Sequence, residues 1–131
     1  MAERLDSGLS EGVHYGWQGE SAISAIDSSG NATINITPPR GYTHWFAAVE
    51  FFQDVNGDNQ AEPDSGTLTF TIKSPVLPEF YQAFTSNTVD LSSANAQVNW
   101  GSPTCGVRVV LSGVSGDSVS HARLRISGHV S

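Results

Sequence analysis

The densest group of metal-binding side chains in this 131-residue chain lies in one short loop. Asp54, Asn56 and Asp58 supply oxygen atoms at alternate positions, and the carboxylates of Glu62 and Asp64 follow. Calcium takes about six to eight oxygen ligands, and alternate side chains on a tight loop are one way in which a short peptide supplies them. These five residues are therefore the candidate calcium ligands.

The same loop departs from the usual calcium-binding loop at two positions. That loop has glycine at its sixth position and a carboxylate at its twelfth, where this chain has Asn59 and Ser65. An Asn-Gly-Asp turn is also common for conformational reasons, because Asn and Gly tolerate positive φ. Two interpretations stay open: a calcium site, or a connection shaped by turn chemistry in a protein that needs no cofactor.

No other arrangement of residues points to catalysis. The four histidines share no metal-ligand spacing, and the single cysteine, Cys105, excludes an internal disulfide or a zinc site built from several cysteines of one chain. The serines lack a Gly-x-Ser-x-Gly elbow, and no glycine-rich phosphate loop precedes a helix. Paired carboxylates for glycoside hydrolysis normally come from separate elements, whereas the aspartates at 54, 58 and 64 share one loop. The sequence predicts a protein that is not an enzyme.

Aromatic residues form a second group of candidates. Trp17, Trp45 and Trp100, together with the three tyrosines, have the residue types of a platform for sugar rings, as in carbohydrate-binding modules of the sandwich class. Trp45 lies inside an apolar run, which favours core packing. Trp17 and Trp100 sit beside glycines, which favours partial exposure and a ligand or interface role. A carbohydrate-binding module that presents exposed Trp and Tyr is therefore an alternative function.

Composition excludes several classes of partner. The formal net charge is −7, and nucleic acid is not expected as a partner because phosphate binding needs a basic surface. The first residues are acidic and lack the apolar segment of a secretory signal, and no later run is long enough to span a membrane. We therefore expect synthesis in the cytoplasm and no membrane partner.

Short segments with strand character recur about every ten residues, separated by turn residues, and none carries a helical apolar stripe. The predicted strands lie at 13–18, 21–27, 31–37, 42–53, 67–73, 79–84, 88–91, 96–100, 106–112 and 118–127. This spacing predicts an all-β protein, an antiparallel β-sandwich or jelly roll. Residues 1–12 have no periodicity and are predicted to form a flexible N-terminal arm, and residues 13–131 to form a single domain.

Two pairs of these segments have the pattern of β-hairpins: 42–53 with 67–73, and 106–112 with 118–127. Three of these four segments, 67–73, 106–112 and 118–127, alternate apolar and polar residues, as half-buried strands do. The segment at 42–53 instead has apolar residues at both parities, for example Trp45 and Phe51 on one and Phe46 on the other. Both of its faces are therefore expected to be covered, one by the core and the other by, for example, a second subunit.

Arginines mark the polar side of the second predicted hairpin. Arg108, Arg123 and Arg125 are predicted to share the outer face of two adjacent strands as a positive stripe on an acidic protein. This stripe is either a solubilising face with carboxylates nearby or a docking surface for an acidic neighbour, such as an identical subunit. The resulting interface candidates are Trp17, Trp45, Phe51, Trp100, Arg108, Arg123 and Arg125.

Two stretches resemble small β-rich virion proteins of tailed bacteriophages. The first runs from Val49-Glu-Phe-Phe-Gln-Asp54, through a loop ending Ala61-Glu-Pro-Asp-Ser-Gly66, into Thr67-Leu-Thr-Phe-Thr-Ile72. The second is Val107-Arg-Val-Val-Leu-Ser-Gly-Val-Ser-Gly116 followed by His121-Ala-Arg-Leu-Arg-Ile-Ser-Gly128.

The resemblance implies a structural protein of the virion, made in the host cytoplasm, with no enzymatic activity and no cofactor. Within that group a capsid decoration or cement protein, or a head-fibre protein, is the expected type. Its partners would be the major capsid protein or other virion proteins. Self-association as a homo-oligomer, with a trimer as the expected state, agrees with a small domain that tiles a larger surface.

Overall fold

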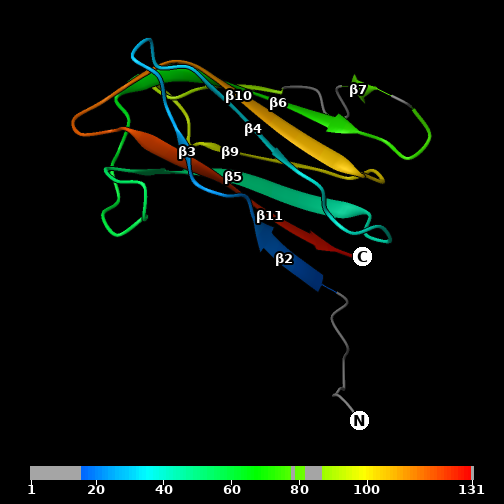
Figure 1. Cartoon of the computed structure of the whole chain (residues 1–131). Coiled ribbons are helices and arrows are strands. Elements are labelled where there is room, and N and C mark those ends of the chain that lie inside the picture. The colour runs from blue at the N-terminus through cyan, green and yellow to red at the C-terminus, as the bar shows by residue number, and fades with distance from the viewer. Residues whose placement is uncertain (1–15, 78, 82–86, 131) are drawn as a thin grey trace.

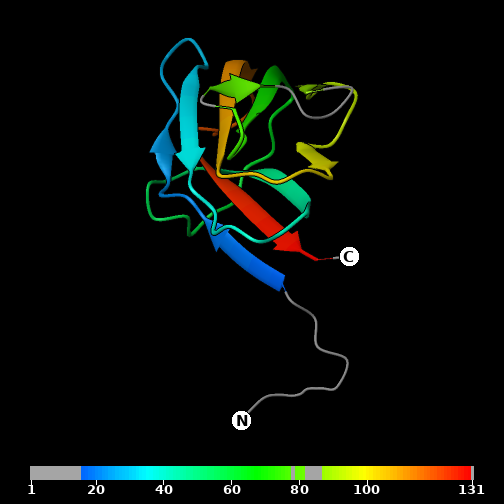
Figure 2. The same ribbon diagram turned by 90° about the vertical axis from the view of Figure 1, so that its right-hand side faces the viewer.

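The computed structural model describes residues 16–77, 79–81 and 87–130, and it forms a two-layered β-sandwich (Figures 1 and 2). The predicted arm, residues 1–12, lies outside the described residues. No helix in the described ranges has the length and apolar character needed to cross a membrane.

One layer, which we call the β11 sheet, is antiparallel throughout. Its strands in order are β2 (Gly16–Glu20), β11 (His121–His129), β5 (His44–Phe52) and β9 (Gln97–Trp100), with β3 (Ser24–Ala25) paired to β11. Strands β3 and β2 follow each other along the same edge of β11, because β3 pairs with its first residues and β2 with its last.

The facing layer, the β10 sheet, has the same organisation. Its strands in order are β4 (Ala32–Ile36), β10 (Gly106–Ser115), β6 (Ser65–Lys73) and β7 (Phe80–Tyr81), with β8 (Thr88–Asp90) paired to β6. Strands β7 and β8 likewise share one edge of β6.

The chain crosses between the two layers at almost every connection. If each edge pair is taken as one interrupted strand, successive strands alternate between the two sheets with one exception. Strand β6 and the β7–β8 pair that follows it both lie in the β10 sheet. The resulting orders, β2-β11-β5-β9 and β4-β10-β6-β8, are those of a jelly roll, in which two Greek keys form the two sheets. The predicted fold class, an antiparallel sandwich or jelly roll, is confirmed.

Both predicted hairpins are wrong, because their arms lie in opposite sheets. Strand β5 pairs with β11 and β9, whereas β6 pairs with β10, β7 and β8. Residues 53–64 form a connection between layers, far longer than the two to five residues of an ordinary hairpin loop. The predicted turn at Gly113 is instead an irregularity within β10, where the register shifts between Ser112 and Ser115 and Gly113 has a φ of 62°.

The core lies between the sheets and contains the faces that alternation predicts. Leu68, Phe70 and Ile72 of β6 are fully buried, and they face the buried Leu124 and Ile126 of the opposite sheet. Each large apolar side chain buried in this way contributes about 1.5–3 kcal/mol relative to leaving it exposed.

The second apolar face of β5 is covered in part by the chain itself. Phe52 is only 2% exposed, because the Arg123 guanidinium lies 5.0 Å from its ring centroid and the loop backbone at Gly57 packs against the ring and against Ile23. Phe46, on the same face, remains 39% exposed. The expectation that both faces are covered therefore holds at Phe52 and fails at Phe46.

Candidate functional site

Three of the interface candidates belong to the core. Trp45, Phe51 and Trp100 are 2%, 5% and 6% exposed, so their side chains are not available to a partner. The two indoles stack with ring centroids 6.4 Å apart. Trp45 Nε1 donates to the carbonyl of Ser102 at 3.0 Å, and Trp100 Nε1 donates to Thr104 Oγ1 at 2.9 Å. Because each buried N–H has an acceptor, packing explains both residues.

Burial removes Trp45 and Trp100 from the predicted aromatic platform. Trp17 is half-buried against the core, and its ring lies over Gly19, where a Cβ would come within 2.3 Å of it. Tyr42 packs edge-on against Trp45, with ring centroids 5.8 Å apart, and Tyr81 is also half-buried against the core. Tyr15 lies outside the described residues.

The predicted arginine stripe is also wrong, because β10 and β11 are in different sheets. Arg108 lies on the outer face of the β10 sheet, where Nε donates to Asn35 Oδ1 at 3.0 Å and the guanidinium carbon is 4.1 Å from the Phe80 ring centroid. Arg123 and Arg125 lie together on the outer face of the β11 sheet.

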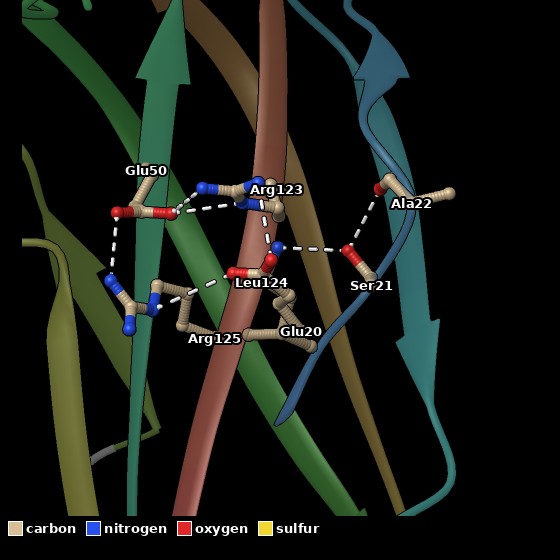
Figure 3. A network of polar contacts seen from close by, with 7 residues as sticks. All are labelled: Glu20, Ser21, Ala22, Glu50, Arg123, Leu124 and Arg125. Atoms are coloured by element: carbon tan, nitrogen blue, oxygen red, sulfur yellow. Dashed lines mark hydrogen bonds and ion pairs between the residues drawn. The ribbon is translucent and has the colours of Figure 1, made fainter. Parts of the chain in front are cut away.

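On that face the two arginines meet two glutamates from neighbouring strands (Figure 3). Arg123 Nε and Nη2 donate to Glu50 Oε1 at 2.9 and 2.7 Å, and Arg125 Nη1 donates to Glu50 Oε2 at 3.2 Å. Glu20 approaches Arg123 Nη1 at 3.4 Å and Arg125 Nε at 3.9 Å. The positive charges are therefore matched by carboxylates of the same sheet, as the solubilising interpretation expects.

We expect Glu50→Gln to lower the free energy of unfolding by about 1 kcal/mol, because it weakens the charge-assisted bonds from two arginines at a half-buried site. Urea unfolding of the variant and of Glu79→Gln, a matched change at an exposed residue, measures the effect. Equal stability of both variants and the unmodified protein would show that the network adds nothing to the fold.

The candidate calcium loop is organised by its own hydrogen bonds. Asp54 Oδ1 accepts from the backbone N–H of Asp58 at 2.9 Å, and Oδ2 accepts from Asn59 Nδ2 at 3.0 Å. Among the described residues, no group of three or more His, Cys, Asp or Glu side chains is arranged to hold a metal ion. The geometry fits the turn interpretation of the loop, in which the Asp54 carboxylate holds the backbone.

These contacts predict a pH dependence. Desolvation raises the pKa of Asp54, but the hydrogen bonds from Asp58, Asn59 and Gly57 together lower the pKa below its ordinary value of 3.8. A lowered folded-state pKa means that ionised Asp54 stabilises the fold above the unfolded-state pKa and loses this effect as pH falls through the folded-state pKa. We expect Asp54→Asn to be less stable than the unmodified protein at neutral pH, with the difference shrinking in acid. Urea titrations at several pH values test this, and a constant difference would contradict it.

The outer face of the β11 sheet also carries a shallow hollow of about 320 Å³ beside the ion-pair network. Its lining includes Gln18 of β2, Phe46, Ala48 and Glu50 of β5, Gln97 of β9 and Arg125 of β11. Ala48 has a small side chain, so the floor of the hollow at its centre lies below the longer side chains around it. The hollow is thus built from all four main strands of the sheet.

Sequence reasoning did not identify this hollow. One signal for it was present, since the apolar residues at both parities of β5 placed Phe46 on a face opposite the core. Nothing in the sequence indicated that Gln18 and Gln97 would line the hollow. They come near Phe46 only because β2 and β9 flank β11 and β5 in the sheet.

Comparisons with known proteins give a family and distant structural likenesses. No curated protein matches the chain. Among solved structures, the chain is similar to the crystal structure of "a non-crystalline cellulose specific carbohydrate-binding module: CBM28", with 10% identity, a TM-score of 0.37, and coverage of 88% of this chain and 72% of that one. The family described as "Domain of unknown function (DUF7265)" matches residues 18–130, a span that includes nearly every strand of both sheets. The chain therefore belongs to the DUF7265 family.

Proposed function

We propose that this protein is a non-enzymatic structural protein of a tailed-bacteriophage particle, a capsid decoration protein that docks on the head. The observation that carries the proposal is where the resembling residues lie. They form β5, β6, β10 and β11, and β10 and β11 are each flanked by strands on both sides. The resemblance thus concerns the centre of the fold and not a peripheral piece.

The surface of the domain supports a binding role. Arg123 and Arg125 are paired with carboxylates of their own sheet. Arg108 donates a hydrogen bond to Asn35 and packs over the Phe80 ring. Because these three arginines are already held within the domain, docking would rest on many weak contacts repeated over a lattice, where multivalency supplies the affinity. Assembly as a trimer, with the major capsid protein as partner, follows from the same proposal.

Separation of a native source lysate on a density gradient tests this function. Mass spectrometry of the fractions then locates the chain. Co-migration with large particles in many copies, resistant to a salt wash, is the expected result. A chain that stays at the top of the gradient as a small species would overturn the virion assignment.

A second candidate function, carbohydrate binding, is favoured by one specific observation. The hollow on the β11 sheet combines a partly exposed aromatic ring, Phe46, with side-chain amides and an ion pair. Ligand sites in proteins typically join apolar and aromatic surface to a few well-placed polar groups. A glycan array probed with the purified chain tests this function, and signals no higher than background on every glycan would exclude it.

A further inference from the structure

We infer that the hollow on the outer face of the β11 sheet is a binding site for a neutral sugar chain that lies across the strands. The inference rests on the second candidate function and deepens it, because it names the ligand class, the orientation and the residues.

Strand register arranges the residues in and beside the hollow in two rows that cross the sheet. One row contains Gln18, Ser127, Phe46 and Asn99, which are consecutive partners from β2 to β9. The next row contains Glu20, Arg125, Ala48 and Gln97 in the same strand order. Neighbouring strands are about 4.8 Å apart, so each row extends roughly 14 Å. A hollow flanked by two such rows has the span for an extended chain of rings.

Phe46 supplies the apolar contact in the first row. Phe46 is 39% exposed, although aromatic side chains gain most from burial. The small neighbour Ala48 leaves space beside the ring in the direction of the second row. The C–H face of a pyranose ring can cover this surface while its hydroxyls remain at the rim. Stacked His44 and His129, with ring centroids 5.3 Å apart, continue the face beyond Phe46.

The charges at the opposite end cancel, which selects a neutral ligand. Glu20 and Glu50 face Arg123 and Arg125, so this patch has two charges of each sign. An acidic sugar that approached Arg125 would also approach the carboxylate of Glu50, 3.2 Å from its Nη1. Neutral hydroxyls avoid this repulsion, since they donate to the carboxylate and accept from the guanidinium.

The amides complete the recognition of hydroxyls. Gln18 and Gln97 line the hollow from β2 and β9, on opposite sides of Phe46 and Ala48. Each amide offers both donors and acceptors, which is the mixed capacity that a sugar hydroxyl needs. The arginines and glutamates are held by one another, so the charged end of the hollow is organised before any ligand arrives (Figure 3).

Titration calorimetry of the full chain against defined oligosaccharides tests the inference. The probes are neutral hexasaccharides of glucose, galactose and mannose, and an acidic hexasaccharide of galacturonic acid. We expect binding to at least one neutral probe and none to the acidic probe. Phe46→Ala should weaken binding about tenfold or more, and Gln97→Ala several-fold, as expected for contacts at the centre of a small site. Val110→Ala, a change at a similarly exposed residue on the β10 sheet, should leave binding unchanged.

The possible failures are distinguishable. Binding to the acidic probe alone would keep carbohydrate binding as a function and overturn the neutral-ligand inference. Neutral binding that Phe46→Ala leaves intact would overturn the position of the site. The absence of binding to every probe, together with a blank glycan array, would overturn the second function itself. A thermal melt of each variant confirms that it is folded before titration.

Discussion

Replacement of Trp45 by alanine is expected to lower the free energy of unfolding by about 3–5 kcal/mol, the usual cost of deleting a large buried aromatic side chain. Trp45 is 2% exposed and is the second residue of β5. It stacks on Trp100 and meets the edge of Tyr42. Its removal opens a cavity between the sheets and leaves the carbonyl of Ser102 without the indole N–H.

Urea unfolding followed by far-ultraviolet circular dichroism measures this effect. The matched control is Phe46→Ala, the next residue on the same strand, whose ring points to the outer face. We expect the control to cost less, about 2 kcal/mol, because more than a third of Phe46 is already exposed. Similar losses for the two variants would mean that the indole is not part of the core.

Gly128→Ala is the second substitution with a large expected effect, about 2–3 kcal/mol. A Cβ at this position would lie 2.5 Å from Trp45 Cζ3, with two more ring atoms within 3.0 Å. The Trp45 ring is held by its contacts with Trp100 and Tyr42, so it cannot move away without disturbing the core. Overpacking of this kind typically costs about 1–3 kcal/mol, and a rigid obstacle puts the cost toward the upper end.

Thermal and urea unfolding of Gly128→Ala test this. Gly101→Ala is the control, because a Cβ there would meet its nearest neighbours at 3.7 Å, an ordinary contact distance. A smaller penalty for Gly128→Ala in a Trp45→Phe background would identify the ring as the obstacle, since residues in contact are not additive. An equal penalty in both backgrounds would point to backbone strain in β11.

Strand positions could be predicted from the sequence, but strand partners could not. Alternation in β6 placed Leu68, Phe70 and Ile72 on one buried face, because side-chain direction along a strand is a local property. Partner choice depends on how the connections run. The twelve residues between β5 and β6 look like a long hairpin loop and in fact cross between layers. The same error placed Arg108 beside Arg123 and Arg125, in the wrong sheet.

The candidate sites divide in the same way, into features set by neighbouring residues in the sequence and features set by strand pairing. The turn interpretation of the loop at Asp54 was available from residue preferences, because Asp, Asn and Gly act on their immediate neighbours. Trp100 was misjudged because its adjacent glycine suggested exposure, whereas its burial comes from Trp45 on the neighbouring strand. The hollow at Phe46 needs side chains from four strands that are distant in sequence, so only the three-dimensional structure brings it together.

The position of the last two strands has a consequence for biosynthesis. Strands β10 and β11 lie between neighbours in their respective sheets, so residues 106–129 supply an inner strand of both layers. While the ribosome is still making the earlier part of the chain, β4 and β6, and likewise β2 and β5, have no strand to join them. Neither layer is completed before these residues emerge, and the nascent chain exposes unpaired strand edges until then. In cells that make this protein quickly, many incomplete chains are present at once, and their unpaired strand edges can associate with one another. Slower synthesis or chaperone binding should therefore raise the yield of folded protein.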